Sequence, residues 1–192
     1  MDINNINIAQ NNYNLYKSLE KMIKKAGKRE IIFLCVGNPK IWFDSFGPIV
    51  GSVLKHLKIE KFIYGNTLSY INAKNIEHYV KMIYGFHTNP FIIVFDNAIS
   101  NDLEPTLKIR EGEIKCASFS KNPVYVGDYN ITYCLNKNHL KNNNIYFSMI
   151  KDLKNLIRMI YFVLNSEKLK NAKLMWLIIK IIHLKWFYIE FL

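Results

Sequence analysis

Short apolar runs, bounded by residues typical of turns, mark where this chain is expected to form buried strands. The runs are IIFLCV at 31–36 and FIIVF at 91–95, with a shorter stretch, KFIY, at 61–64. β-branched and aromatic residues dominate them, and runs of this length are typical of strands buried on both faces of a sheet. We therefore predict a strand in each of these three segments.

Between and around these strands, apolar residues recur at helical spacing. The spacing predicts helices over about 13–25, 47–58, 73–83 and 145–165. Strands that alternate with helices are typical of a parallel sheet with right-handed crossovers. We predict a single three-layer α/β/α domain over residues 13–165, with a mostly parallel sheet of about five strands.

After the third strand the pattern changes. Residues 106–119 (TLKIREGEIKCASF) alternate around Glu111 and Gly112, which is typical of a hairpin. Two short extended pieces follow, at 123–128 and 131–135. We expect the remaining strands of the sheet among these pieces.

The two ends of the chain differ from the domain between them. Residues 1–12 are rich in Asn and are predicted to be a disordered start, whereas 166–192 are predicted to be an apolar, helical tail. The tail is interrupted by Lys180, His183, Lys185 and Glu190, and charges in its middle count against a membrane-spanning helix. Three roles stay open: docking on the domain or on a second copy, association of 170–192 with a membrane surface, or no selected role.

The net charge raises the question of a nucleic-acid partner. The chain has 26 Lys and Arg against 15 Asp and Glu, a net charge of +11. Arg, the better ligand for phosphates and base edges, occurs only at 29, 110 and 158. Asn, Ile and Lys are abundant, as in proteins from AT-rich genomes. We attribute the charge to this bias and predict no nucleic-acid partner.

The spacing of the cysteines and the lack of certain motifs exclude further classes of protein. The three cysteines form no CxxC pair, which excludes a disulfide scaffold and a thiolate zinc site. The first thirty residues lack a basic start followed by an apolar run, so no secretory signal is predicted. Without a Walker loop or GxGxxG, nucleotide binding has no support. We expect a cytoplasmic protein without a resident cofactor.

Two carboxylates fall where an open α/β sheet places its sites, at the carboxyl ends of strands. Asp44 follows the first predicted strand and Asp96 ends the third. If these strands are neighbours, both side chains face one crevice, where repulsion raises one pKa and the pair holds a single proton. Such a pair can activate water and protonate a leaving amine, or hold a divalent cation. The structural alternatives are a helix cap for Asp44 and a strand-end turn residue for Asp96.

The residues around these carboxylates resemble known motifs. VGNPKIWFDSFGPIVG (36–51) resembles the first motif of a superfamily that includes hydrogenase maturation endopeptidases and the spore germination protease. Its pattern is a strand, Gly-Asn, a loop, a carboxylate at Asp44, and a small or aromatic residue before Gly47. FIIVFD (91–96) resembles the second motif, an apolar strand that ends in a carboxylate, here Asp96.

The chain resembles more closely one family of that superfamily, the YyaC family of sporulation proteins, whose protease activity is inferred rather than established. Four segments resemble that family in order: FLCVGNPKIWFDSFGPIVG at 33–51, IYGNTLSYINAKNI at 63–76, FIIVFDNAIS at 91–100 and NPVYVGDYNITYCLN at 122–136. No single segment is specific, but the ordered set is. The resemblance extends to about residue 165 and leaves out the Asn-rich start and the tail.

The resemblance implies a fold of the hydrogenase maturation protease type and a peptidase-like activity on a protein substrate in a sporulating cell or forespore. Asp44 and Asp96 would share the acid and base roles, with water as the nucleophile and no resident metal. In the hydrogenase relatives, similar carboxylates and a His recognise nickel, so a divalent metal stays an alternative. Of the five His, only His139 lies in a loop that could approach such a site.

Five further residues are candidates for substrate binding. Asn38 and Asn97 flank the two carboxylates and can hydrogen-bond a substrate backbone or their own loops. Gly47 belongs to the first motif, and Lys121 matches a Lys that the family carries. Asp128 is either a third carboxylate near the site or an ordinary turn residue after Gly127.

The sequence also departs from the family pattern in two places. Asn72 stands where the family tends to have His, and the segment before Val-Gly-Asp is shortened to KCASFSKNPVY at 115–125. These departures keep open a second function: a non-catalytic, protein-binding member of the same fold, associated with a membrane surface through its tail.

Overall fold

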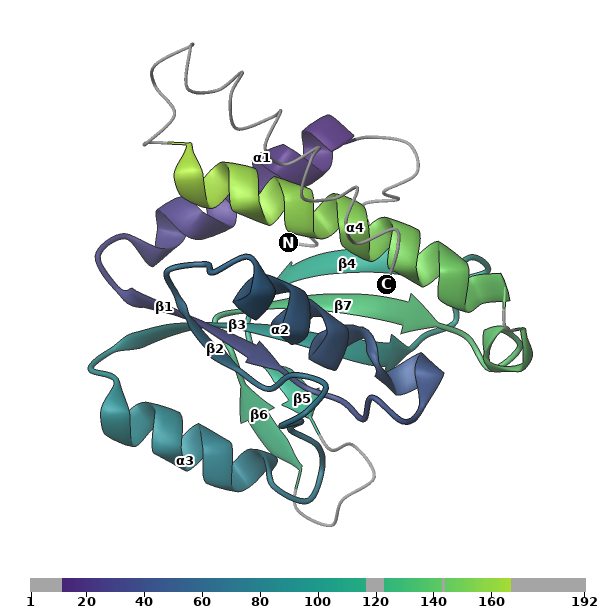
Figure 1. The fold of residues 1–192 in the computed structure, drawn as a ribbon, viewed down its shortest axis with the longest axis horizontal. Coiled ribbons are helices and arrows are strands. Elements are labelled where there is room, and N and C mark those ends of the chain that lie inside the picture. Colours follow the sequence, from purple (N-terminus) through teal and green to yellow (C-terminus); the bar gives the residue numbers. More distant parts are fainter. Residues whose placement is uncertain (1–11, 117–122, 143, 167–192) are drawn as a thin grey trace.

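A five-stranded sheet forms the centre of the computed structural model, which describes residues 12–116, 123–142 and 144–166 (Figure 1). The strand order is β2–β1–β3–β7–β4. The bounds are Glu30–Cys35 for β1, Phe62–Tyr64 for β2, Pro90–Ile99 for β3, Thr106–Glu111 for β4 and Tyr129–Leu135 for β7. β2, β1, β3 and β7 run parallel, and β4 is antiparallel to β7. The prediction of a mostly parallel sheet of about five strands is confirmed.

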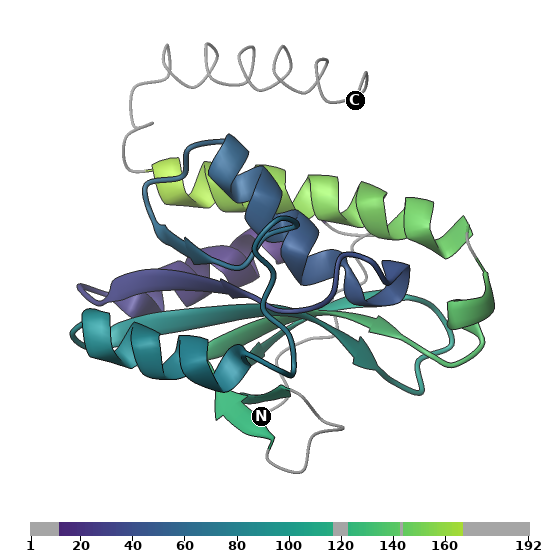
Figure 2. The ribbon, with the colours of Figure 1, turned by 60° about the horizontal axis from the view of Figure 1, so that its bottom comes forward.

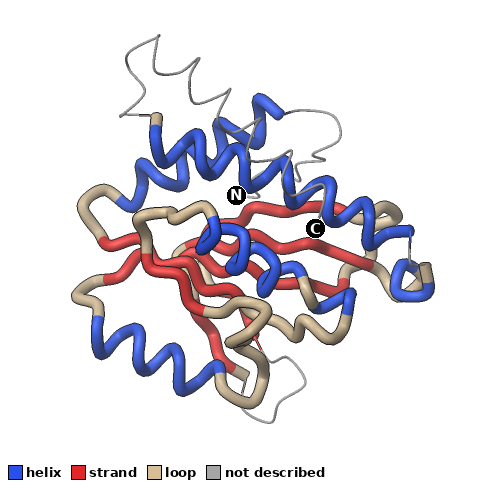
Figure 3. Tube along the Cα trace, viewed as in Figure 1, coloured by secondary structure: helices blue, strands red, loops and turns tan. Residues whose placement is uncertain are grey.

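Layers on both faces of the sheet complete the three-layer architecture. Helices α1 (Asn12–Ala26), α2 (Phe46–His56) and α4 (Asn144–Asn165) cover one face (Figure 2). Helix α3 (Ile76–Phe86) and a two-stranded ribbon of β5 (Ile114–Cys116) and β6 (Val124–Val126) cover the other. Figure 3 shows the helices lying on either side of the red strands. Short 3-10 turns, Trp42–Asp44 and His139–Lys141, precede α2 and α4.

Alternate residues of the central strands belong to two different apolar cores. Phe33, Phe95 and Tyr133 are fully buried on the side of α1, α2 and α4. Ile32 and Val94 are fully buried on the side of α3 and the ribbon. This double burial explains the continuous apolar runs, since neither face of these strands meets water. The chain's three cysteines are buried free thiols: Cys35, Cys116 and Cys134.

The hairpin predicted over 106–119 is wrong. β4 pairs with β7 in the main sheet, and β5 pairs with β6 in the separate ribbon. The cause is burial, because Leu107 and Ile109 on β4 belong to the helix-covered core while Cys116 on β5 belongs to the opposite core. The chain passes between the two layers at Gly112, whose φ of +102° favours glycine.

The predictions for the chain ends fall mainly outside the described residues. This applies to the disordered start, apart from Asn12 where α1 begins, and to residues 167–192 of the tail. In the part of the chain that the structure describes, none of the helices combines the length and the apolar character that a membrane span requires.

Candidate functional site

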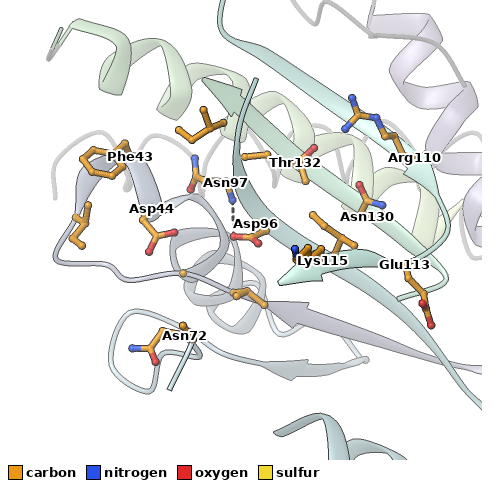
Figure 4. Close-up of a pocket in the computed structure, with 17 residues that line it drawn as sticks. Phe43, Asp44, Asn72, Asp96, Asn97, Arg110, Glu113, Lys115, Asn130 and Thr132 are labelled. Atoms are coloured by element: carbon orange, nitrogen blue, oxygen red, sulfur yellow. Dashed lines mark hydrogen bonds between the residues drawn. The ribbon is translucent and has the colours of Figure 1, made fainter. Parts of the chain in front are cut away.

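A pocket of about 660 Å³ opens at the carboxyl ends of β1 and β3 (Figure 4). Its walls come from the segment after β1, from Asn72 and Ala73 ahead of α3, and from the last residues of β3. Residues of β4, β5 and β7 complete it. Both Asp44 and Asp96 line this pocket, so the expectation that the two carboxylates face one crevice is confirmed.

Asp44 is held by the loop that connects β1 to α2. It ends the 3-10 turn that precedes α2, and its Oδ2 accepts a hydrogen bond of 2.9 Å from the backbone amide of Asn38. Gly37 permits this tight loop, since a Cβ there would lie 2.1 Å from the Asp44 carbonyl oxygen. Burial raises the pKa of the half-buried Asp44 carboxyl, and the Asn38 amide opposes that rise.

Asp96 lies deeper, on β3 just beyond the end of β1. The last backbone contact between the two strands runs from the Val36 amide to the Phe95 carbonyl, at 2.8 Å. The side chain of Asp96 accepts a hydrogen bond of 2.8 Å from the Asn97 amide, and the residue is 9 % exposed. Burial raises the pKa of Asp96 well above its usual range, and the nearby charge of Asp44 raises it further.

The two environments shift the pKa values of the pair unequally. Burial raises both, but Asp96 is more buried and lies near the Asp44 charge, whereas Asp44 accepts an amide hydrogen bond, so Asp44 is the member that ionises first. A pair in which one carboxyl ionises before the other can provide one proton donor and one proton acceptor in the same pocket. Acid–base hydrolysis needs one of each.

Asn38 and Asn97 lie next to the carboxylates but make bonds within the protein. The Asn38 side chain accepts a hydrogen bond of 3.1 Å from the Lys40 amide. The Asn97 Oδ1 accepts a bond of 2.9 Å from the Phe46 amide, so it caps α2 from a neighbouring strand. Ser45, the residue at the helix start, instead donates its hydroxyl to the Trp42 carbonyl. Asn97 also lines the pocket, so the structure gives it a structural bond and leaves room for a contact with substrate.

Gly47 positions the helix that follows Asp44. A Cβ at this residue would lie 2.2 Å from the Val36 carbonyl oxygen and 2.6 Å from that of Phe95. The first turn of α2 can therefore lie against the ends of β1 and β3 only because residue 47 has no side chain. The structure places Gly47 beneath the site rather than on the pocket wall.

Asp128 lies at the opposite end of the sheet, so its expected place near the site is corrected. It directly precedes β7. Its Oδ2 accepts a hydrogen bond of 2.8 Å from the Ile92 amide, and its Oδ1 forms an ion pair with Arg29 at 2.6 Å. These bonds join the amino ends of β3 and β7. Asp128 is thus the turn residue of the two alternatives. Lys121, the other distant candidate, lies outside the described residues.

His139 also lies away from the pocket. Its Nδ1 accepts a hydrogen bond of 3.0 Å from the Asn136 amide, and its Nε2 lies 2.9 Å from the Leu103 carbonyl oxygen. It therefore fastens the loop after β7 and contributes nothing to a metal site at the two carboxylates. Among the described residues, no group of three or more His, Cys, Asp and Glu side chains is arranged to hold a metal ion.

Other pocket residues were missed from the sequence. Thr132 lies opposite Asp96 in the β3–β7 register, and Asn130 and Arg110 lie opposite each other on β7 and β4. All three line the pocket. The sequence does show polar residues at alternate positions of β7. They can be assigned to the pocket only once β7 is known to lie beside β3. Asn72, singled out earlier as a departure from the family pattern, lines the pocket as well.

The fold and pocket define a three-layer α/β protein with two carboxylates at the strand ends. Residues 3–165 match the family described as "Protein of unknown function (DUF1256)", and the chain belongs to this family. It is similar to "Uncharacterized protein YyaC" of Bacillus subtilis (strain 168), with 30% identity over 121 residues. That segment is 62% of this chain and 59% of the relative's length. No solved structure matches the chain.

Proposed function

We propose that this chain is a peptidase-like hydrolase that cleaves a peptide bond of a protein substrate with Asp44 and Asp96. The observation that carries the proposal is the pair itself: Asp44, from the loop after β1, and Asp96, on the adjacent strand β3, line one pocket. Burial and the Asp44 charge raise the pKa of the deeper Asp96, which suits it to hold a proton. The resemblance of the surrounding motifs to peptidases supports the same reading.

The two carboxylates would have complementary roles. Ionised Asp44 takes a proton from a water molecule as the water oxygen attacks the carbonyl carbon, and neutral Asp96 donates its proton to the carbonyl oxygen. The resulting tetrahedral diol breaks its C–N bond. Asp44 then gives its proton to the departing amine, and Asp96 recovers a proton from the diol as the new carboxyl group forms. Both residues return to their starting protonation states, and one water is consumed.

The setting of this activity is part of the proposal. We propose a substrate present in sporulating cells, because the ordered segments between residues 33 and 136 resemble a family of sporulation proteins. A second candidate function, peptide binding without turnover, is favoured by Asn72, which lines the pocket where the family tends to have His.

A search for new peptide termini separates these two functions. The purified full chain is incubated with an extract of sporulating cells, beside a variant carrying Asp44→Asn and Asp96→Asn. Glu77→Gln is the matched control, since it also removes a carboxylate, one that lies exposed on α3 away from the pocket. New termini are identified by mass spectrometry.

The expected result is a set of termini made by the natural chain and the control and absent with the double variant. The same termini with all three proteins would show that Asp44 and Asp96 are not the catalytic pair. If no new termini form although circular dichroism shows every protein folded, the hydrolase proposal fails and the binding function takes its place.

A further inference from the structure

The end of the pocket beside Asp44 is lined by large apolar side chains. Ile41 is 38 % exposed and Ile99 is 53 % exposed, although both line the pocket. Phe43 lies between Ile41 and Asp44 in the chain, and its ring packs edge-on against Trp42 with centroids 5.7 Å apart. These residues come from two separate segments, the loop after β1 and the end of β3. Their convergence leaves apolar surface uncovered next to the carboxylate pair.

The opposite end of the same pocket is polar. Arg110, Glu113 and Lys115 line it from β4, from the turn before β5 and from β5 itself. Figure 4 shows Phe43 at one end, Arg110 and Glu113 at the other, and Asp96 between them. A chain lying across the carboxylates would therefore meet apolar surface on one side of the reacting bond and charged surface on the other.

We propose that Ile41, Phe43 and Ile99 form a specificity subsite for a bulky apolar side chain next to the bond that is cleaved. This inference rests on the hydrolase function proposed above and adds the class of substrate: an unfolded segment with Ile, Leu, Met or Phe at one fixed position beside the cleaved bond. Binding pockets are commonly apolar walls with a few convergent polar groups, and here the apolar wall lies directly beside the reacting groups.

The energetic reason is the burial of apolar surface on both partners. A bulky apolar side chain that enters this end covers the exposed parts of Ile41 and Ile99 while it leaves water itself. A serine at the same position would bury its hydroxyl against the same apolar wall and would gain little free energy from the burial of apolar surface. We expect a preference of about tenfold or more for Leu over Ser, which is the scale of burying one aliphatic side chain.

The test compares two synthetic peptides, blocked at both ends, that differ only by Leu or Ser beside a cleavage site found in the extract experiment. The natural chain is compared with a variant carrying Ile41→Ala and Ile99→Ala. Phe86→Ala is the matched control, because it removes a large apolar side chain, 77 % exposed, from the end of α3. The rate constant kcat/KM and, by fluorescence anisotropy, peptide binding are both measured.

The expected result is a Leu preference in the natural chain and in the Phe86→Ala control that falls toward equality in the double variant. Cleavage without a Leu preference, or a preference that survives both substitutions, overturns the subsite while the hydrolase function stands. If an unbiased peptide library is not cleaved at all, the hydrolase function fails, and binding of library peptides decides the subsite. Apolar-selective binding that the double variant loses supports it, and unselective binding overturns it.

Discussion

Replacing Gly47 by alanine tests whether the close contact between α2 and the strand ends positions the site. A Cβ at residue 47 would lie 2.2 Å from the Val36 carbonyl oxygen, 2.6 Å from the Phe95 carbonyl oxygen and 2.7 Å from the Val36 nitrogen. Each distance is well short of ordinary van der Waals contact, which begins at about 3.5 Å. All three are backbone atoms, of Val36 directly after β1 and of Phe95 on β3, so no side chain can rotate away.

The expected cost follows from two opposing terms. Overpacking of a close-packed interior costs roughly 1–3 kcal/mol, and more where backbone must move. Alanine recovers up to about 1 kcal/mol of helix propensity relative to glycine. We therefore expect Gly47→Ala to lower the free energy of unfolding by about 2 kcal/mol. Because α2 follows Asp44 directly, the displaced helix should also shift that carboxylate and weaken peptide cleavage.

Gly85→Ala is the matched control, because Gly85 also lies in a helix, α3, and a Cβ there would meet nothing within 4 Å. We expect that variant to be more stable by up to about 1 kcal/mol. Urea unfolding followed by circular dichroism measures both changes. With a slope of about 2 kcal/mol per molar urea, Gly47→Ala should lower the midpoint by about 1 M. A Gly47→Ala midpoint equal to that of the natural chain would refute the argument.

Three further outcomes are expected. Burial raises the pKa of Asp96 in the folded state, so unfolding releases a proton and stability falls as pH rises above about 4. The melting temperature of Asp96→Asn should therefore increase relative to that of the natural chain as the pH rises above about 4, and a difference that does not change with pH would contradict this. Asn97→Ala removes the side chain that accepts a hydrogen bond from the Phe46 amide at the start of α2, and it should lower the free energy of unfolding in urea by about 1 kcal/mol. An unchanged free energy of unfolding would show that this bond does not stabilise the helix. His87→Ala removes a buried ring that is hydrogen-bonded to Tyr64 Oη at 2.7 Å, and it should lower the free energy of unfolding by about 2–3 kcal/mol without changing peptide binding. Weaker peptide binding by the folded variant would contradict this.

The elements predicted with success are those whose signal is local. The runs at 31–36 and 91–95 became β1 and β3, and the helix predicted over 47–58 became α2. These patterns predict the elements correctly because they depend only on burial: both faces of the strands and one face of the helix contact apolar residues, whichever elements those residues belong to. The helix predicted over 73–83 begins later, at Ile76, because the Asn72 amide bonds to the Asn75 side chain and forms a turn first.

The features that could not be predicted depend on contacts between distant parts of the chain. Asp128 has the local sequence of a turn or of a site residue, and its partner Arg29 lies 99 residues away. The polar wall of Asn130 and Thr132 becomes visible only with the register that places Thr132 beside Asp96. The shared pocket of the two carboxylates could be predicted, because sites at the carboxyl edge of parallel sheets are general. The prediction that Asp96 ends its strand is wrong, since β3 continues to Ile99 by pairing with β7.

The three buried thiols provide an internal reporter of how this fold opens. Burial raises the pKa of Cys35 and of Cys116, so in the closed protein neither is an accessible thiolate that a maleimide or disulfide reagent can attack. Cys35 lies on β1, Cys134 on β7 and Cys116 on the ribbon beside the pocket. Labelling rates at each cysteine therefore distinguish opening of the ribbon alone from opening of the whole sheet, without introducing any probe.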